Sequence, residues 1–351
     1  MKTRRDFLIR SAAVAGAVLI EPVRSWSQLN TNYPTFDFHS HPGLFVAKGT
    51  PIYKGDAGVL KTINEMNDGG LNGAFFSLVA DGPIVKVGAN GVTPFGDYKP
   101  GEAWKEYKRQ LMILKGIIEN MPMTYATKAD DLKIAQQSHK VAAFIAIEGG
   151  DFLEGKVDGL DEMYADGVRS IQLVHYHPNA IGNLQTADPQ HDGLSAAGKE
   201  IVKKMNKLKM VIDVAHAAES TVKSVVDITD SPIILSHSVL QVDISRALSK
   251  RAITAEHAKL VAKTGGIIGA WPSGYNKDFN DFIDNVKRLA DLVGVDHVGL
   301  GTDMDGNFKP VMTDYLQMKQ WTDALKAKGF TADEVGKIAG GNAVRLLKKV
   351  L

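Results

Sequence analysis

The sequence contains no cysteine among its 351 residues. A disulfide framework, a thiolate metal site and a cysteine nucleophile are therefore excluded, so any metal ion must be bound by histidine, aspartate or glutamate. The sequence also lacks an excess of charge of either sign, because its formal net charge is +1. Residues 1–27 carry five basic and two acidic side chains, which leaves about −2 on the remainder. This balance argues against a nucleic-acid-binding protein.

The apolar run near the N-terminus is too short to span a bilayer, because it covers only residues 12–20. It follows Arg4 and Arg5 in the segment TRRDFL, which resembles the twin-arginine export consensus. We therefore interpret residues 1–27 as a signal peptide that is removed near Ser27. The mature protein is then expected in the periplasm, without a membrane span. The alternative is a cytosolic amphipathic N-terminus that contains two arginines by coincidence.

The rest of the chain is long enough, with 44% hydrophobic residues in the whole sequence, to form one large core. Short apolar runs alternate with longer segments of helical periodicity, which is typical of repeated βα units and a parallel sheet. The pattern predicts a single (β/α)8 barrel of the TIM type over residues 28–351. The eight expected strands cover residues 35–38, 73–79, 141–147, 168–174, 210–214, 232–235, 266–270 and 297–301.

Two of the expected helices begin with clear capping signals. Ser195 and Thr254 precede amphipathic segments that extend to Leu208 and Lys263. The interval after the second strand, residues 80–140, is far longer than one helix needs, and it begins with a stretch rich in glycine and proline. We expect an insertion there, with a loop over the barrel mouth followed by helices at about 102–120 and 128–138.

Polar residues follow the expected strands at the end where barrel enzymes place their active sites. His39 and His41 lie two residues apart at the first strand, so their side chains should point to the same side and bind one ion together. A single histidine at a strand end is more often structural. Six strands, however, end in residues of the metal-binding types, and this joint occurrence favours a metal centre.

Glu148 ends an otherwise apolar strand, where an ionised carboxylate needs a cation beside it. It can bridge two metal ions, or it can pair with a lysine or arginine, although neither ends a neighbouring strand. With imidazole and carboxylate ligands, zinc is the first expectation, while manganese, iron and cobalt stay open.

The sequence resembles the membrane (renal-type) dipeptidase family, binuclear zinc peptidases of the amidohydrolase barrel type. The resemblance covers most of the mature chain. Its motifs are FDFHSHPG at 36–43, AIEGG at 146–150, QLVHYHPNAIGN at 172–183, ILSHS at 234–238, HVGLGTDMDG at 297–306 and GGNAVRLL at 340–347.

The resemblance implies two divalent metal ions that share Glu148. One ion would be bound by His39, His41, Glu148 and Asp303, and the other by Glu148, His216 and His237. His175 corresponds to the histidine that polarises the scissile carbonyl, and Arg251 to the arginine that binds the substrate carboxylate. Arg246 competes with Arg251 for this role.

One residue departs from the family pattern. Where the dipeptidases usually have His-x-Asp, this chain has His39-Ser40-His41, so a neutral ligand replaces an anionic one. The affinity and identity of the first metal ion are therefore open.

The expected activity is hydrolysis of the amide bond of a small dipeptide by a metal-bridged hydroxide. Asp303 would transfer the proton from water to the leaving amine, although it can instead cap the loop that follows it. Two alternatives stay open: a related barrel hydrolase that acts on a lactone, cyclic amide or phosphoester, and an exported binding protein without turnover. Oligomeric state is not determined, and a homodimer is compatible with the sequence.

Overall fold

The computed structural model describes residues 33–88 and 91–351. The expected signal peptide at residues 1–27 lies outside these ranges and stays a prediction. Among the described helices, none combines the length and apolar character needed to cross a membrane.

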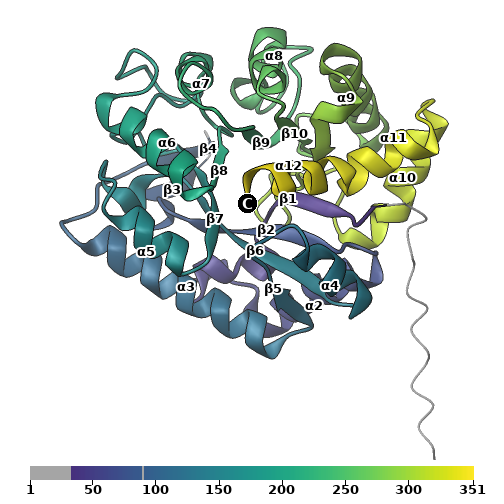
Figure 1. The fold of residues 1–351 in the computed structure, drawn as a ribbon, viewed down its shortest axis with the longest axis horizontal. Coiled ribbons are helices and arrows are strands. Elements are labelled where there is room, and N and C mark those ends of the chain that lie inside the picture. Colours follow the sequence, from purple (N-terminus) through teal and green to yellow (C-terminus); the bar gives the residue numbers. More distant parts are fainter. Residues whose placement is uncertain (1–32, 89–90) are drawn as a thin grey trace, which may run out of the picture.

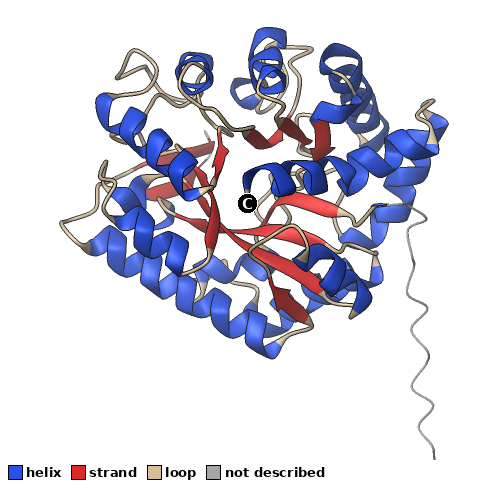
Figure 2. Cartoon of the chain, viewed as in Figure 1, coloured by secondary structure: helices blue, strands red, loops and turns tan. Residues whose placement is uncertain are grey.

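Eight parallel strands form a closed barrel surrounded by helices (Figures 1 and 2). Neighbouring strands pair in sequence order, and the ring is closed by pairings of β1 with β11 and of β2 with β6. This confirms the expected (β/α)8 fold. The barrel strands are β1 (Phe36–Ser40), β2 (Gly73–Val79), β6 (Val141–Glu148), β7 (Val168–Gln172), β8 (Val211–Asp213), β9 (Ile234–Ser238), β10 (Ile267–Ala270) and β11 (Val298–Leu300).

The boundaries of β2 agree with the expected ones, and those of the other strands differ by at most three residues. The expected strand 35–38 extends to Ser40, and the expected strand 232–235 extends to Ser238. His39 and His237 therefore lie inside strands rather than after them, each at a point where the register of the pairing with a neighbouring strand shifts.

Helices follow the strands and pack on the outside of the barrel. Ser195 and Thr254 cap their helices as expected, accepting from the backbone N–H of Gly198 at 2.9 Å and His257 at 3.0 Å. The helices are α2 (Gly55–Asp68), α3 (Glu102–Asn120), α4 (Asp131–Gln137), α5 (Gly159–Ala165), α6 (Ala196–Leu208), α7 (Glu219–Val226), α8 (Ala255–Lys263), α9 (Phe279–Val293), α10 (Met318–Ala327), α11 (Ala332–Gly336) and α12 (Asn342–Val350).

The insertion after β2 contains both expected helices, α3 and α4, and two features that the sequence did not predict. An antiparallel hairpin pairs β3 (Val85–Gly88) with β4 (Gly91–Pro94). The short strand β5 (Met123–Tyr125) pairs with the beginning of β6, while β7 pairs with its later half. These short strands contain lysine, threonine, glycine or proline in place of an apolar run, so they gave no strand signal.

The barrel interior is filled by aromatic and aliphatic side chains at the amino ends of the strands. Phe36, Phe38, Phe75 and Phe144 form one cluster, with ring centroids 5.2 to 6.3 Å apart. Leu346, Leu347 and Val350 of α12 belong to the same cluster, and α12 lies across the middle of the barrel in Figure 1. This end of the barrel is therefore closed by apolar packing, which leaves the carboxyl ends of the strands for polar chemistry.

Candidate metal centre and active site

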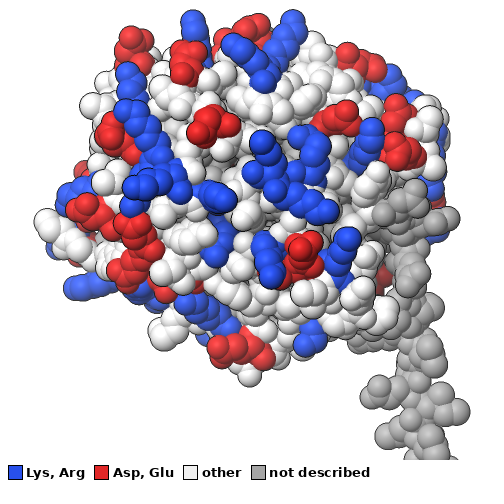
Figure 3. All heavy atoms as spheres, viewed as in Figure 1, with Lys and Arg blue, Asp and Glu red and all other residues white. Residues whose placement is uncertain are grey.

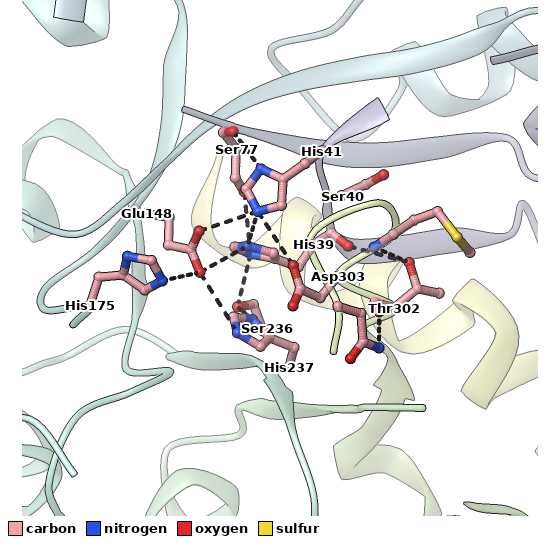
Figure 4. A network of polar contacts seen from close by, with 12 residues as sticks. His39, Ser40, His41, Ser77, Glu148, His175, Ser236, His237, Thr302 and Asp303 are labelled. Carbon is pink, nitrogen blue, oxygen red and sulfur yellow. Dashed lines mark hydrogen bonds and ion pairs between the residues drawn. The ribbon is translucent and has the colours of Figure 1, made fainter. Parts of the chain in front are cut away.

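The six expected metal ligands meet at the carboxyl end of the barrel, and all are buried. Figure 4 shows His39, His41, Glu148, His237 and Asp303 among them. The six ligands come from five regions of the ring: β1 and the residue after it, the end of β6, the segment after β8, β9, and the segment after β11. The residues are His39, His41, Glu148, His216, His237 and Asp303.

Glu148 lies at the centre of this cluster. Its Oε1 atom is 3.3 Å from His39 Nε2, 3.5 Å from His216 Nε2 and 3.8 Å from His237 Nε2. Its Oε2 atom is 3.2 Å from His41 Nε2. Both carboxylate oxygens therefore face imidazole nitrogens, which is the arrangement a bridging carboxylate requires.

The histidine rings are oriented with lone pairs toward the cluster. The Nδ1 atom of His41 lies 3.0 Å from the carbonyl oxygen of Ser77, which can only accept, so Nδ1 carries a proton. In the neutral ring Nε2 then bears a lone pair, and it faces His39 Nε2 at 3.0 Å and Asp303 Oδ1 at 3.4 Å. His216 Nε2 and His237 Nε2 also lie 3.0 Å apart. A divalent cation satisfies such facing lone pairs.

Serine hydroxyl groups contact the Nδ1 atoms of the His39 and His237 rings. His39 Nδ1 lies 3.2 Å from Ser77 Oγ and 3.3 Å from Ser236 Oγ, and Ser236 Oγ is also 3.0 Å from His237 Nδ1. Such partners orient ligand rings and fix their tautomers.

Two fully buried networks support the strand ends. Asp37 Oδ1 accepts from the backbone N–H of His39 at 3.1 Å and of Thr302 at 2.9 Å, so one carboxylate ties β1 to the segment that carries Asp303. Asp213 Oδ1 similarly accepts from the backbone N–H of Ala215 and Ser236. The backbone of the ligand-bearing segments is thereby fixed by hydrogen bonds.

The pKa values of Glu148 and Asp303 shift in opposite directions, although burial raises both. Burial alone would raise the pKa of Glu148, but the neighbouring His175 and His39 rings outweigh it and hold this pKa well below the ordinary value. Burial raises the pKa of Asp303 to about 6, although His41 and His39 oppose the shift. The Glu148 side chain is thus anionic, whereas Asp303 can exchange a proton near neutral pH.

His216 and His237 are held neutral. Burial lowers the pKa of both rings well below the ordinary value, and the nearby Arg251 adds to this effect. Neutral imidazole is the form that binds a metal ion. His216 and Asp303 also have positive φ angles of 64° and 53°, a strained conformation that is common at functional sites.

His175 lies beside the cluster, with Nε2 3.2 Å from Glu148 Oε1. Its Nδ1 atom is 2.6 Å from Asp81 Oδ1. Burial would lower the pKa of His175, but the Asp81 and Glu148 carboxylates raise it to about 9.

Arg251 and Arg246 have different surroundings. Arg251 is 2% exposed, lies with its guanidinium over the Trp271 ring at 5.6 Å and approaches His237 Nε2 at 3.5 Å. Arg246 forms an ion pair with Asp281 at 2.6 Å. Only Arg251, of these two, contacts the ligand cluster.

The residues present fit one or more divalent metal ions. Within the described chain, three overlapping groups have ligand atoms within 4.8 Å of one another: His39, His41 and Asp303; His39, Glu148 and His237; and Glu148, His175 and His216. His39 belongs to the first and second groups, and Glu148 belongs to the second and third. The three groups therefore form one continuous cluster.

Sequence reasoning missed two polar residues that reach the site, Ser77 on β2 and Asp81 after it. Asp81 lies just beyond the strand end, the same kind of position that identified the other candidates. It was overlooked because it begins a segment rich in glycine and proline, which we interpreted only as a loop.

A parallel (β/α)8 barrel with a buried histidine and carboxylate cluster at its carboxyl end belongs to the class of barrel metallohydrolases. The family described as membrane dipeptidase (Peptidase family M19) matches residues 23–351, and the chain belongs to this family.

Known proteins agree with this assignment. The chain is 27% identical to the dipeptidase tcpJ of Claviceps purpurea over 300 residues, which is 82% of this chain and 68% of that protein. A solved structure of dipeptidase AC, a metallo peptidase of family M19, shares 20% identity, with a TM-score of 0.77 over 91% of this chain and 98% of that one. A metallo peptidase from Rhodobacter sphaeroides, liganded with a phosphinate mimic of the dipeptide L-Ala-D-Ala, has 20% identity and a TM-score of 0.76, over 92% of this chain and all of that one.

Proposed function

We propose that the chain is a dipeptidase that hydrolyses the amide bond of a free dipeptide with two divalent metal ions, zinc in the first instance. Family membership supports the reaction class, and the shared ligand Glu148 supports two neighbouring ions. The phosphinate mimic of a dipeptide bound to the Rhodobacter sphaeroides metallo peptidase supports a dipeptide as the substrate class.

The observation that carries the proposal is the environment of Arg251. Its guanidinium is almost completely buried, and its polar contacts are with Gln185, Tyr176 and His237. In the described part of the chain, no carboxylate forms an ion pair with it. A buried cation of this kind requires an anion, and the paired N–H donors of a guanidinium match a carboxylate. We assign this anion to the C-terminal carboxylate of the substrate.

The remaining residues account for the chemistry around the scissile bond. When bound, the metal ions would activate water and polarise the carbonyl. Asp303, with its raised pKa, accepts a proton from the attacking water and donates it to the leaving amine. His175 directs Nε2 toward the cluster, where it can donate to the carbonyl oxygen. Arg251 fixes the distance from the substrate C-terminus to these groups.

The test is the Arg251→Ala variant with a free dipeptide and with the same dipeptide amidated at its C-terminus. Charge-assisted hydrogen bonds contribute about 1.5–3 kcal/mol, so KM for the free dipeptide should rise about 10- to 100-fold. KM for the amide should change much less. Arg246→Ala is the matched control, because Arg246 pairs with Asp281, and it should leave both values near the wild type. Equal losses on both substrates would reject Arg251 as the carboxylate anchor.

A further inference from the structure

Asp81 begins the insertion after β2, and its side chain is completely buried. Its two carboxylate oxygens have different partners. Oδ1 lies 2.6 Å from His175 Nδ1, and Oδ2 accepts from the backbone N–H groups of Tyr176 at 3.0 Å and His177 at 2.9 Å. One carboxylate thus holds both an imidazole ring and the backbone directly after it.

The contact of Asp81 with the ring determines where the ring points. A carboxylate facing Nδ1 keeps the proton on that nitrogen, and the opposite nitrogen, Nε2, lies 3.2 Å from Glu148 Oε1. The ring is also packed between Tyr176 and His216, with centroids 4.6 and 4.5 Å away. Without Asp81, the packing would remain but the hydrogen bond that fixes the ring rotation would be lost.

We propose that Asp81 is a positioning residue for the reaction, which acts by fixing the orientation of the His175 ring so that Nε2 faces the cluster. The inference rests on the proposed function, because His175 is assigned there to the substrate carbonyl. It also makes the first residues of the insertion part of the active site. A carboxylate is required because it accepts from the ring and from both backbone N–H groups at once.

Asparagine at this position has almost the same shape but only one accepting oxygen. If that oxygen keeps the two backbone N–H groups, the amide nitrogen faces His175 Nδ1 and presents a donor to a donor. Asp81→Asn should therefore preserve the loop and remove the acceptor for the ring.

The alternative is that Asp81 only anchors the loop after β7. The chain offers a matched control for this, because Asp151 anchors the same loop without contacting His175. Asp151 Oδ1 lies 2.8 Å from His177 Nδ1, and Oδ2 accepts from Asn179 Nδ2 at 3.3 Å. Asp151→Asn loosens the loop while leaving the Asp81 and His175 pair intact.

The kinetic test measures kcat and KM of the metal-loaded protein for a free dipeptide in wild type, Asp81→Asn, Asp151→Asn, His175→Gln and the Asp81→Asn, His175→Gln double variant. Partners that orient active-site histidines typically contribute about 10- to 100-fold, so Asp81→Asn should lower kcat by that factor with KM within about threefold. In the His175→Gln background the same change should cost less than about threefold, because its target is gone. Asp151→Asn should stay within about threefold of wild type. Equal losses in both backgrounds, or an equal loss in Asp151→Asn, would overturn the proposal.

A second readout does not depend on turnover. The protein has ten histidines, so labelling them with 15N and comparing wild type with His175→Gln identifies the His175 signals. The Nδ1 proton signal of His175 should be present in wild type and in Asp151→Asn, and it should shift or disappear in Asp81→Asn. An unchanged signal in Asp81→Asn would contradict the inference. Failure of the wild type to hydrolyse any dipeptide would instead reject the proposed function, and the 15N signals would still decide the role of Asp81.

Discussion

Glu148 contacts histidines that belong to four other strands or strand ends, so the geometry of the cluster depends on this one side chain. Its low pKa follows from the same contacts, because surrounding imidazoles favour the ionised carboxylate despite complete burial. A residue with this position is the expected link between two metal ions.

Replacing Glu148 with alanine should therefore abolish occupancy by two ions. We expect the metal content of the purified protein, measured by mass spectrometry, to fall from about two ions per chain to about one or fewer. Glu119→Ala, which removes an exposed carboxylate of α3, is the control and should keep the wild-type content. A full complement in Glu148→Ala would exclude the bridging role.

Asp303 is expected to carry the proton, because burial raises its pKa to about 6 and it lies 3.4 Å from His41 Nε2. Asp303→Asn should lower kcat by about a hundredfold to ten-thousandfold, since an amide cannot accept and return the proton. The measurement is steady-state hydrolysis of a dipeptide by the metal-loaded variant. Turnover close to the wild-type rate would remove Asp303 from the mechanism.

At the scale of elements, the ligand-bearing ends of β1 and β11 are joined by a buried network. The Tyr315 hydroxyl donates to Asp37 Oδ2 at 2.6 Å and accepts from Ser40 Oγ at 2.8 Å, while Asp37 Oδ1 accepts from the backbone N–H groups of His39 and Thr302. Tyr315→Phe removes a donor to a buried carboxylate. We expect the free energy of unfolding, from denaturant titration, to fall by about 1–3 kcal/mol. An unchanged value would show that this network does not stabilise the strand ends.

The insertion is fixed to the barrel by Asp166, at the end of α5. Asp166 accepts from Lys108 at 2.6 Å, Tyr107 at 3.0 Å and Lys115 at 3.2 Å, all on α3. Burial would raise the pKa of Asp166, but these hydrogen bonds outweigh it and lower the pKa below its ordinary value. A lowered folded-state pKa means that the stabilisation is complete above the unfolded value of about 3.9 and is lost as the pH falls through the folded value.

Asp166→Asn should consequently lower the free energy of unfolding by about 1 kcal/mol near neutral pH, a modest figure because the site is partly solvated. The difference from wild type should shrink as the pH is lowered below about 4. Denaturant titrations at several pH values provide the measurement. A difference that is constant with pH would contradict the electrostatic origin.

The fold could be predicted largely from the sequence because each barrel strand is an apolar run of β-branched and aromatic residues between helical periods. The cluster of histidines and carboxylates could be predicted because its members lie at the carboxyl ends of those runs. The hairpin β3–β4 and β5 could not, because their short strands contain lysine, threonine, glycine or proline in place of an apolar run. Asp81 and His175 are 94 positions apart in the sequence, and only the folded barrel brings them together. Their contact therefore could not be predicted from the sequence. The sequence likewise could not show that Arg246 forms an ion pair with Asp281, whereas Arg251 lies beside His237.

At the scale of the whole molecule, side chains of both charges lie on the face shown in Figure 3, and basic ones gather across its middle. The presence of both signs agrees with the near-neutral composition.

The export route is a proposal that rests on Arg4 and Arg5, which lie outside the described residues. Replacing both with lysine preserves the charge but should block twin-arginine transport, so the precursor should accumulate in the cytoplasm. Fractionation of cells that express the two forms tests this. Mature protein that still reaches the periplasm would indicate another route.

The central claim is tested most directly by the rate at which the purified mature protein hydrolyses a free dipeptide, compared with a lactone and a phosphoester, before and after metal removal. The account predicts dipeptide hydrolysis that is lost on chelation, restored by Zn²⁺ and much faster than reaction with the other two substrates. Dipeptide hydrolysis that survives complete metal removal would contradict the account. The absence of dipeptide hydrolysis in protein loaded with metal would contradict it as well.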